Sequence, residues 1–280
     1  SNYKMSAKRK ADEDLPATYV TGFHDLEVIK KMKYRYVPHF GLVSIISFGA
    51  SGLGGMFAAG QGTGVKDAAA GKGDDDDVWF MEDQPEDQAN AKAIVLSCLK
   101  AGINLIDTSH WYGQGRSERL LGHALQDVPR SAYYINSKIG RYDKDPLKMF
   151  DFSFHKTYQA GLDTLKRLQL DCIDSMQIHD PEFAPSIDVL LNETLPALQQ
   201  LKTEGKIRLI GVTGYPLALQ QEIITRAAVG IDTSLTYCHY SLNDTSLADS
   251  GFIELCHTKG IGLINASPIA MGLLMNRDPP

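Results

Sequence analysis

Short apolar runs alternate with helical segments from residue 86 to residue 267, and this alternation limits the possible folds more than any other feature. A strand with one face in water alternates apolar and polar residues, whereas these runs are almost continuously apolar. Strands that are buried on both faces and separated by helices form a parallel sheet covered by helices. Six or seven strand–helix units therefore predict an α/β domain with a parallel sheet.

The predicted elements are short and evenly spaced. Helices are expected at residues 86–101, 117–126, 154–168, 195–203, 217–228 and 252–259, and strands at residues 103–107, 133–138, 172–179, 207–213, 233–240 and 262–267. Before them, β-like runs at residues 33–37 and 42–48 predict an N-terminal hairpin that leads into a buried strand. Residues 1–31 are expected to form a tail and residues 32–280 the domain, with residues 58–83 as a low-complexity insertion.

Polar residues or glycines end most of the predicted strands, and this placement separates two candidate architectures. In a (β/α)8 barrel the functional groups lie at the C-terminal ends of successive strands. An open doubly wound sheet instead has its site at one switch point and carries a Gly-x-Gly-x-x-Gly fingerprint. The glycine-rich loop at residues 49–55 lacks that fingerprint, so the sequence favours the barrel. By strand count Pro280 follows the seventh strand, so we expect a (β/α)8 TIM barrel with an N-terminal β-hairpin, truncated after strand 7.

Three residues near the ends of two neighbouring strands form a candidate proton-transfer group. Asp107 ends one strand, Tyr112 follows it, and Lys138 ends the next strand. An isolated charge at the end of a buried strand is costly, so Asp107 and Lys138 are expected to pair. The ordinary pKa of a phenol is about 10, and a neighbouring ammonium lowers it. The sequence therefore predicts that Lys138, held by Asp107, lowers the pKa of Tyr112 towards neutrality.

Each of these residues also has an ordinary structural interpretation. Asp107 could cap a turn, and Tyr112 could be a packed aromatic residue. His179, which ends the next predicted strand, could be a core histidine with satisfied hydrogen bonds. Lys138 is harder to explain in this way, because a lysine is rarely buried without a partner. Together, at three consecutive strand ends, the four residues favour catalysis.

The motifs around these residues occur in a definite order. They are Asp107-x-x-x-x-Tyr112-Gly, Ser117-Glu-x-x-Leu-Gly122, Lys138 at the end of a strand, Gln177-Ile-His179 at the end of the next, Gly211-Val-Thr-Gly214 and Ala266-Ser-Pro-Ile269. In type, order and spacing they resemble the aldo-keto reductase superfamily, within its branch of sugar C1 dehydrogenases. The resemblance runs from about residue 32 to residue 276, with the insertion as its main interruption.

The resemblance implies hydride transfer between a nicotinamide and a carbonyl or alcohol carbon, with NAD or NADP as the cofactor. Tyr112 would accept a proton from the anomeric hydroxyl of a sugar as hydride leaves C1, giving a lactone, and His179 would hold the reacting oxygen. The residues implied for cofactor binding are Ser51, Leu53, Asp107, Thr213, Gly214, Ser267 and Ile269. Those expected at the substrate are His110, Trp111 and Asp180, and no metal site is expected.

The chain also departs from the pattern of that superfamily. Thr213 and Gly214 stand where its members usually have Ser-Asn, and Ala266 stands where many have a tyrosine. In that superfamily the residues that bind the adenosine of the cofactor normally lie beyond the seventh strand. We therefore expect the chain as given to bind dinucleotide weakly. Two alternatives are therefore a general aldehyde or ketone reductase that uses the same residues, and an inactive or regulatory nicotinamide-binding paralogue.

Charge and cysteine content narrow the expected partners. A net charge of −6 argues against a nucleic-acid surface, which needs a basic face. The 4 cysteines include no Cys-x-x-Cys pair, so free thiols are expected, and the Cys-His dipeptides at residues 238 and 256 are attributed to packing rather than to zinc. No apolar run approaches the roughly 20 residues of a membrane span, and no signal peptide is recognised. We expect a cytoplasmic monomer or weak oligomer that acts on a small-molecule sugar or carbonyl compound, without nucleic-acid or membrane partners.

Overall fold

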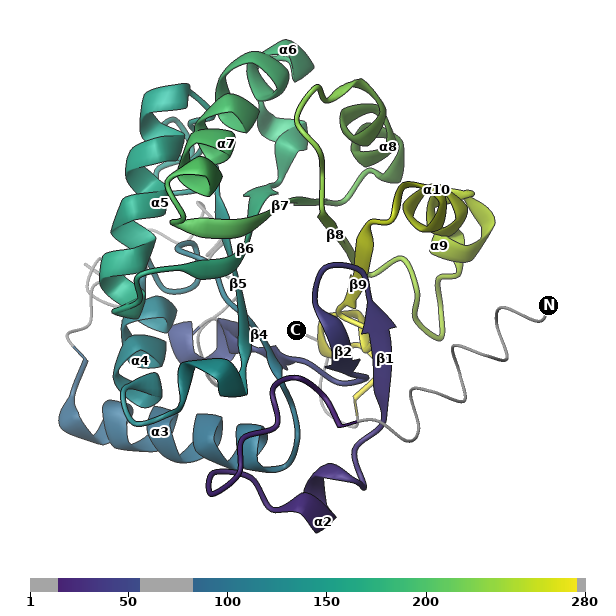
Figure 1. Ribbon diagram of the computed structural model, residues 1–280. Helices are drawn as coiled ribbons and strands as arrows, with labels where there is room; N and C mark the ends of the chain where they lie inside the picture. Colours follow the sequence, from purple (N-terminus) through teal and green to yellow (C-terminus); the bar gives the residue numbers. More distant parts are fainter. Residues whose placement is uncertain (1–14, 56–82, 276–280) are drawn as a thin grey trace.

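The computed structural model describes residues 15–55 and 83–275, in which parallel strands form one curled sheet (Figure 1). The strands are β3 (Phe48–Gly49), β4 (Leu105–Asp107), β5 (Tyr134–Ile139), β6 (Ile173–His179), β7 (Ile207–Gly214), β8 (Thr233–Tyr237) and β9 (Gly262–Ala266). They lie side by side in the order in which they occur along the chain. Such a sheet has no switch point, so the predicted barrel architecture is confirmed over the doubly wound alternative.

Helices cover the outer face of the curled sheet (Figure 1). The longer ones are α3 (Pro85–Lys100), α4 (Arg116–Leu125), α5 (Phe154–Leu168), α7 (Leu195–Thr203), α8 (Leu217–Arg226) and α10 (Phe252–Lys259), and the short ones are α2 (Leu26–Ile29), α6 (Ile187–Val189) and α9 (Ser246–Asp249). Helical backbone already begins at Ile187, rather than at the predicted residue 195. A π-helical segment, Leu190–Thr194, joins α6 to α7. This wider turn accommodates Pro196, which lacks the backbone N–H of a regular helix.

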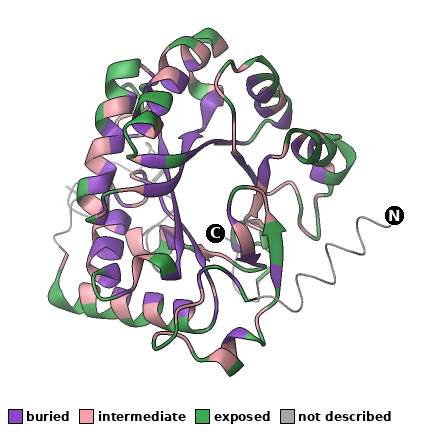
Figure 2. Ribbon diagram, in the orientation of Figure 1, coloured by how far each residue is buried: buried purple, intermediate pink, exposed green. Residues whose placement is uncertain are grey.

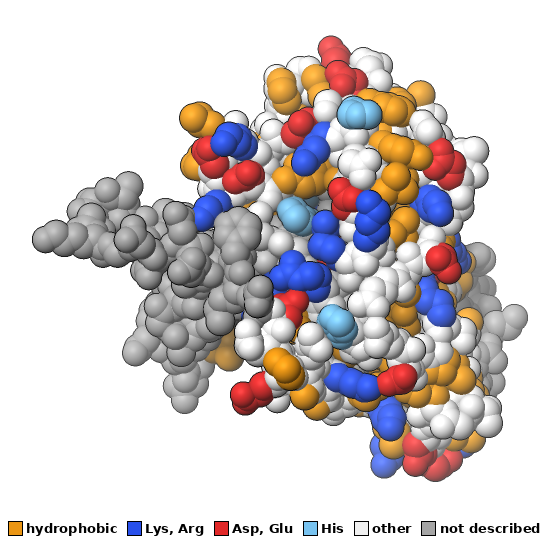
Figure 3. Space-filling view, turned by 90° about the vertical axis from the view of Figure 1, so that its left-hand side faces the viewer, with side chains coloured by type: hydrophobic (Ala, Val, Ile, Leu, Met, Phe, Trp, Pro, Cys, Tyr) orange, Lys and Arg blue, Asp and Glu red, His pale blue; other side chains and the backbone are white. Residues whose placement is uncertain are grey.

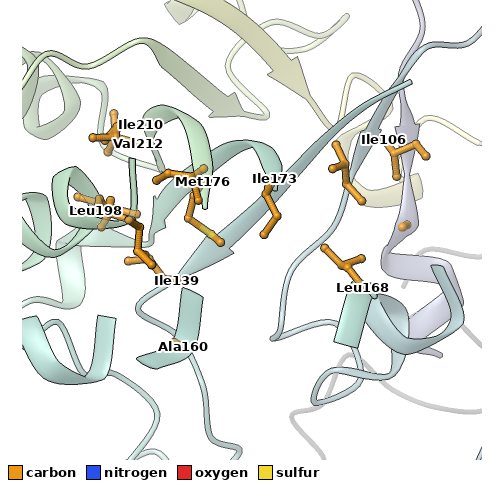
Figure 4. Packing of buried hydrophobic residues seen from close by; sticks show 14 of the residues in the cluster. Ile106, Ile139, Ala160, Leu168, Ile173, Met176, Leu198, Ile210 and Val212 are labelled. Carbon is orange, nitrogen blue, oxygen red and sulfur yellow. The ribbon is translucent and has the colours of Figure 1, made fainter. Parts of the chain in front are cut away.

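The strands and the sides of the helices that face them are largely buried (Figure 2), and apolar side chains fill the layer between them. Strand residues Ile106, Ile173 and Met176 share this layer with helix residues Leu168 and Leu198 (Figure 4). Each of these side chains is almost completely buried. A fully buried leucine or isoleucine contributes about 1.5–3 kcal/mol relative to an exposed one. This layer therefore holds the strand ends, and the side chains they carry, in fixed positions.

Strand β5 shows how the sheet sorts polar side chains. Successive residues of a strand point to opposite faces, so Asn136 and Lys138 point to the same face and Ser137 to the other. On the outer face the Ser137 hydroxyl donates a hydrogen bond of 2.6 Å to the buried carboxylate of Glu118 on α4. Lys138 consequently points into the barrel, where only polar partners can accommodate its charge.

The predicted N-terminal hairpin is present and consists of β1 (Tyr34–Val37) and β2 (Gly41–Ser44). Phe40 and Val43 of the hairpin pack against Leu105, Tyr134 and Leu209 of the strands. The second predicted run, residues 42–48, does not continue as one strand. The Ser44 hydroxyl donates a 2.7 Å hydrogen bond to the Ile46 carbonyl and turns the chain, so that Ile46 is 59% exposed.

Residues 15–31, part of the predicted tail, pack against the barrel. Thr18 is only 3% exposed, and its hydroxyl accepts a 2.8 Å hydrogen bond from the side-chain amide of Asn104. The rest of the predicted tail, residues 1–14, lies outside the described residues. So does the predicted insertion except for Asp83, whose carboxylate forms ion pairs with Arg116 and Arg119 of α4.

Charged side chains of both signs are interspersed on the face that carries α5 (Figure 3). Among the described helices, none is long and apolar enough to cross a membrane.

Candidate active site

A cleft of about 230 Å³ opens where the strands end. The residues predicted from the sequence that line it are Ser51, Asp107, Trp111, Tyr112, Lys138, His179, Asp180, Thr213 and Gly214. Further lining residues are Arg141, Tyr215, Leu235, Tyr237, Ala266 and Met271. Parallel pairing explains this convergence, because Gly49 lies opposite Asp107 and His179 lies opposite Thr213 in neighbouring strands. The polar strand ends thus meet at one rim of the barrel.

Lys138 is the centre of the site. Its ammonium group, 2% exposed, donates hydrogen bonds to the Asp107 carboxylate at 2.8 Å, to the Thr108 carbonyl at 2.8 Å and to the Tyr112 hydroxyl oxygen at 3.1 Å. An ammonium has three protons, and these three acceptors use all of them. Asn136 donates a further 2.6 Å hydrogen bond to Asp107. Each charge of the pair is therefore held by neighbours in the barrel interior.

Two glycines bring Tyr112 to this position. Gly54 and Gly113 cross so closely that a Cβ on Gly113 would lie 2.4 Å from the Gly54 carbonyl oxygen. A Cβ on Gly54 would likewise lie 2.5 Å from the backbone of Tyr112. The glycine-rich loop after β3 therefore packs directly on the loop that carries Tyr112. Its glycines serve a close backbone approach here, which larger residues do not permit.

The pKa of Tyr112 differs in direction from the sequence prediction. Burial raises the pKa of Tyr112 above its ordinary value, although Lys138 acts in the opposite direction. Burial also opposes the charge on Lys138, but Asp107 and Tyr112 outweigh it and raise the pKa of Lys138. The expected lowering was wrong because the depth of the phenol in the barrel could not be read from the motif. Tyr112 is thus a neutral phenol at neutral pH, bound to a lysine that stays charged.

His179 ends β6 and faces Tyr112 across the cleft. The two rings meet edge to face, with 6.4 Å between their centroids. Burial, together with the charges of Lys138 and Arg141, lowers the pKa of His179 well below its ordinary value. The ring is therefore neutral at neutral pH, with one N–H to donate.

Arg141 and Asp180 form the outer wall of the cleft with Trp111. The Arg141 guanidinium lies 3.9 Å above the Trp111 ring and donates a 2.9 Å hydrogen bond to the Asp180 carboxylate. Its Nε–H is buried and has no hydrogen-bond partner among the described residues. Sequence reasoning missed Arg141, although an arginine directly after Gly140, at the end of β5, was a usable signal. This wall combines an aromatic face with donors and an acceptor.

Four predicted site residues do not line the cleft. His110 lies against Tyr142, and burial together with Arg167 lowers the pKa of His110 to about 4. The prediction that His110 shapes the substrate pocket is not supported by this position. Leu53 instead offers its carbonyl to Arg116, and Ser267 accepts a hydrogen bond from the backbone of Met271. Ile269 is exposed.

No three histidine, cysteine, aspartate or glutamate side chains in residues 15–55 and 83–275 are grouped so that they could hold a metal ion. The four cysteines are free thiols, and Cys256 is buried in the core as its place on α10 requires. His239 is held by Ser246 at 2.7 Å, and its other ring nitrogen contacts the Tyr215 carbonyl. Cys238 is partly exposed, and His257 is exposed.

Residues 77–279 match the model of the Aldo/keto reductase family. The chain belongs to this family. It is 39% identical to L-galactose dehydrogenase of Arabidopsis thaliana over 254 residues, which cover 89% of this chain and 69% of that protein. It is 32% identical to D-arabinose 1-dehydrogenase of Saccharomyces cerevisiae over 213 residues, which cover 70% of this chain and 59% of that protein.

A solved structure agrees with this assignment. The holo form of an aldo-keto reductase from Bacillus halodurans superposes with a TM-score of 0.65 at 27% identity, covering 89% of this chain and 70% of that one. The resemblance drawn from the motifs is thus confirmed. Aldo/keto reductases are NAD(P)-dependent oxidoreductases, so family membership assigns this class of chemistry to the chain.

Proposed function

We propose that this aldo/keto reductase oxidises an aldose at C1 to a lactone, with NAD or NADP as the hydride acceptor. The observation that carries the proposal is the contact between the Lys138 ammonium and the Tyr112 oxygen beside a cleft with polar walls. The names of the relatives support the same substrate class, since two of them are dehydrogenases of L-galactose and D-arabinose.

The side chains around the cleft suit the proton movements of that reaction. The C1–H bond breaks as hydride leaves, the anomeric O–H bond breaks as its proton passes to Tyr112, and C1 becomes the carbonyl carbon of the lactone. Tyr112 accepts the proton as a phenolate, which Lys138 stabilises through its 3.1 Å hydrogen bond. Asp107 keeps the ammonium charged and in place, and His179 donates a hydrogen bond to the reacting oxygen.

The cleft fits the nicotinamide end of a dinucleotide. The small side chain of Ala266 leaves room at the end of β9, next to the apolar wall of Leu235. The hydroxyl groups of Ser51 and Thr213 line the same space and can bond to a carboxamide. A bound nicotinamide would supply the carbon that takes up the hydride. Ser267 and Ile269 do not line the cleft. We propose that they belong to the loop that binds the pyrophosphate.

Trp111, Arg141 and Asp180 are proposed to hold the remaining sugar hydroxyls. The Arg141 guanidinium donates hydrogen bonds, Asp180 accepts them, and the Trp111 ring offers an apolar face to the C–H side of a pyranose. Burial raises the pKa of Asp180, while Arg141 acts against that rise. The pair thus presents fixed polar groups at the wall of the cleft.

The test is the formation of reduced NAD and NADP with L-galactose, L-fucose and D-arabinose, followed by absorbance. It is run on this chain and on any longer product that contains it, and the lactone is identified chromatographically. Oxidation of at least one aldose to its lactone supports the proposal. Turnover of none of them, by a folded protein that reduces a simple aldehyde with NADH or NADPH, would overturn it.

A second candidate is the reduction of an aldehyde or ketone by the same residues. The raised pKa of Tyr112 favours it, because a neutral phenol is the form that donates a proton to a developing alkoxide. The two candidates use the same catalytic groups in opposite directions, so relative rates and available substrates decide between them.

The pH dependence of the two directions should differ. Oxidation needs the Tyr112 phenolate. Because the pKa of Tyr112 is raised, only a small fraction of it is ionised at neutral pH. As long as the pH is below that pKa, each increase of one pH unit raises the ionised fraction about tenfold. Reduction needs the neutral phenol, which is already the main form at neutral pH. We expect kcat for aldose oxidation to rise steeply between about pH 7 and 9, and kcat for aldehyde reduction to stay level there. Steady-state rates in both directions would show this, and an oxidation rate independent of pH would contradict it.

Arg141→Met should separate binding from chemistry. The methionine keeps apolar packing on Trp111 but removes the guanidinium, and hydrogen bonds to charged groups contribute about 1.5–3 kcal/mol. KM for the aldose should therefore rise about tenfold to a hundredfold, while kcat changes less than about threefold.

Arg130→Met is the matched control. Arg130 also pairs with a buried carboxylate, that of Asp174 at 2.6 Å, and lies 4.9 Å above the ring of Tyr133. Asp174 lies near the start of β6, at the opposite end from His179. We expect Arg130→Met to lower stability without changing KM, and an equal rise in KM in both variants would refute the role of Arg141.

A further inference from the structure

Ser109 lies beside His179 and is not among the residues assigned to proton transfer, the cofactor or the substrate. It is two residues beyond Asp107 in the loop after β4 and is completely buried. Its hydroxyl oxygen lies 3.3 Å from Nδ1 of His179 and accepts a 3.1 Å hydrogen bond from the backbone N–H of Trp111. Ser109 therefore joins the loop that carries Tyr112 to the ring of His179.

The direction of the serine–histidine hydrogen bond follows from counting protons. A backbone N–H can only donate, so the Ser109 oxygen accepts from Trp111 and keeps its own proton to donate. If Nδ1 of His179 carried the imidazole proton, the serine oxygen would accept twice. Its own proton would then lack an acceptor among the contacts found in the described residues. A buried donor without an acceptor costs about 1–3 kcal/mol, so Ser109 is the donor and Nδ1 the acceptor.

The location of the ring proton matters because His179 is neutral. With Nδ1 occupied as an acceptor, the single imidazole proton lies on Nε2. That atom is on the other side of the ring, 3.7 Å from an oxygen of Asp180, which lines the cleft. The ring thus presents an N–H, rather than a lone pair, to whatever oxygen enters the cleft.

We propose that Ser109 is a positioning residue that holds His179 as the Nε2–H tautomer, so that His179 donates a hydrogen bond to the reacting oxygen. The consequence for rate rests on the proposed function, whereas the tautomer itself does not. Ser109 touches neither substrate nor cofactor in this scheme and acts only through the imidazole ring.

The tautomer can be read by ¹⁵N NMR of the histidine-labelled chain without any ligand, at a pH near 7. His179 is assigned from the signal lost in His179→Gln. We expect a pyrrole-like shift for Nε2 and a pyridine-like shift for Nδ1, displaced upfield by the serine hydrogen bond. In Ser109→Ala part of the protein should adopt the Nδ1–H tautomer, so the averaged Nδ1 shift should move upfield towards the pyrrole value and the Nε2 shift downfield. The value of kcat should then fall about threefold to tenfold with little change in KM. Ser109→Thr, which keeps a hydroxyl, should recover the Nδ1 shift and most of the rate.

Ser175→Ala is the matched control. Ser175 is a buried serine on the same strand as His179, and its hydroxyl bonds to Thr233 at 3.0 Å instead. It should leave the shifts of His179 unchanged. The proposal is overturned if wild-type His179 carries its proton on Nδ1, or if Ser109→Ala leaves both nitrogen shifts where they were. If Ser109→Ala does not fold, the nitrogen shifts of His179 in the wild-type protein decide whether the proposed tautomer is present. Failure of aldose oxidation with the expected spectrum would refute the proposed function and leave the tautomer assignment standing.

Discussion

Tyr112→Phe is expected to lower kcat/KM for aldose oxidation by about 10²- to 10⁴-fold, which is the range that a positioned acid–base group contributes. The substitution removes one oxygen atom, so the ring still packs against His179 and the cleft keeps its shape. The loss should appear in kcat rather than KM, since the proton is transferred only in the transition state. Steady-state kinetics and a thermal unfolding curve measure the two effects separately.

Tyr34→Phe provides the control for this experiment. Tyr34 is also a buried tyrosine, and its hydroxyl donates a 2.9 Å hydrogen bond to the Gly102 carbonyl, away from the cleft. Its loss should lower the free energy of unfolding by about 0.5–1.5 kcal/mol and leave kcat unchanged. If Tyr112→Phe retained the wild-type rate on the same substrates, the assignment of Tyr112 as the acid–base residue would be wrong.

Lys138→Met is expected to damage both stability and activity. Without the ammonium, the Asp107 carboxylate keeps its bond to Asn136 but loses its ion pair, and breaking a buried pair costs about 3–5 kcal/mol. The Tyr112 phenolate loses its stabilising donor at the same time, so kcat/KM should fall about 10²- to 10³-fold. Urea denaturation and steady-state kinetics report the two losses.

The double variant Asp107→Asn with Lys138→Met separates these losses. It removes both charges, so most of the lost stability should return while the activity stays low. Lys202→Met serves as the control, because Lys202 pairs with Asp232 at 2.6 Å in a partly exposed position. Its cost should not exceed about 1 kcal/mol. Full recovery of activity in the double variant would show that Lys138 has only a structural role.

The fold and the meeting of the catalytic side chains could be predicted because both follow from periodicity. Apolar runs between helices indicate a parallel sheet, and strands paired in sequence order bring all their C-terminal ends to one rim. Asp107 and His179 end their strands and Lys138 is the last residue but one of the strand between them, so their proximity could be predicted without coordinates. The ends of strands and helices were harder to predict where a single side chain redirects the backbone. Ser44 ends β2 by bonding to Ile46, and a π turn before Pro196 extends the helical segment.

The sequence alone determined the family, the order of the strands and the residues able to move a proton, because these depend on residue type and spacing. Only the tertiary structure decided that Arg141 lies over Trp111, that His110 lies away from the cleft and that Ser109 reaches His179. It also decided that the pKa of Tyr112 is raised rather than lowered. Hydrogen bonds depend on tenths of an ångström in loop geometry, and desolvation depends on every segment that covers a group. Neither quantity is a property of a local motif, so neither could be read from the chain before it was folded.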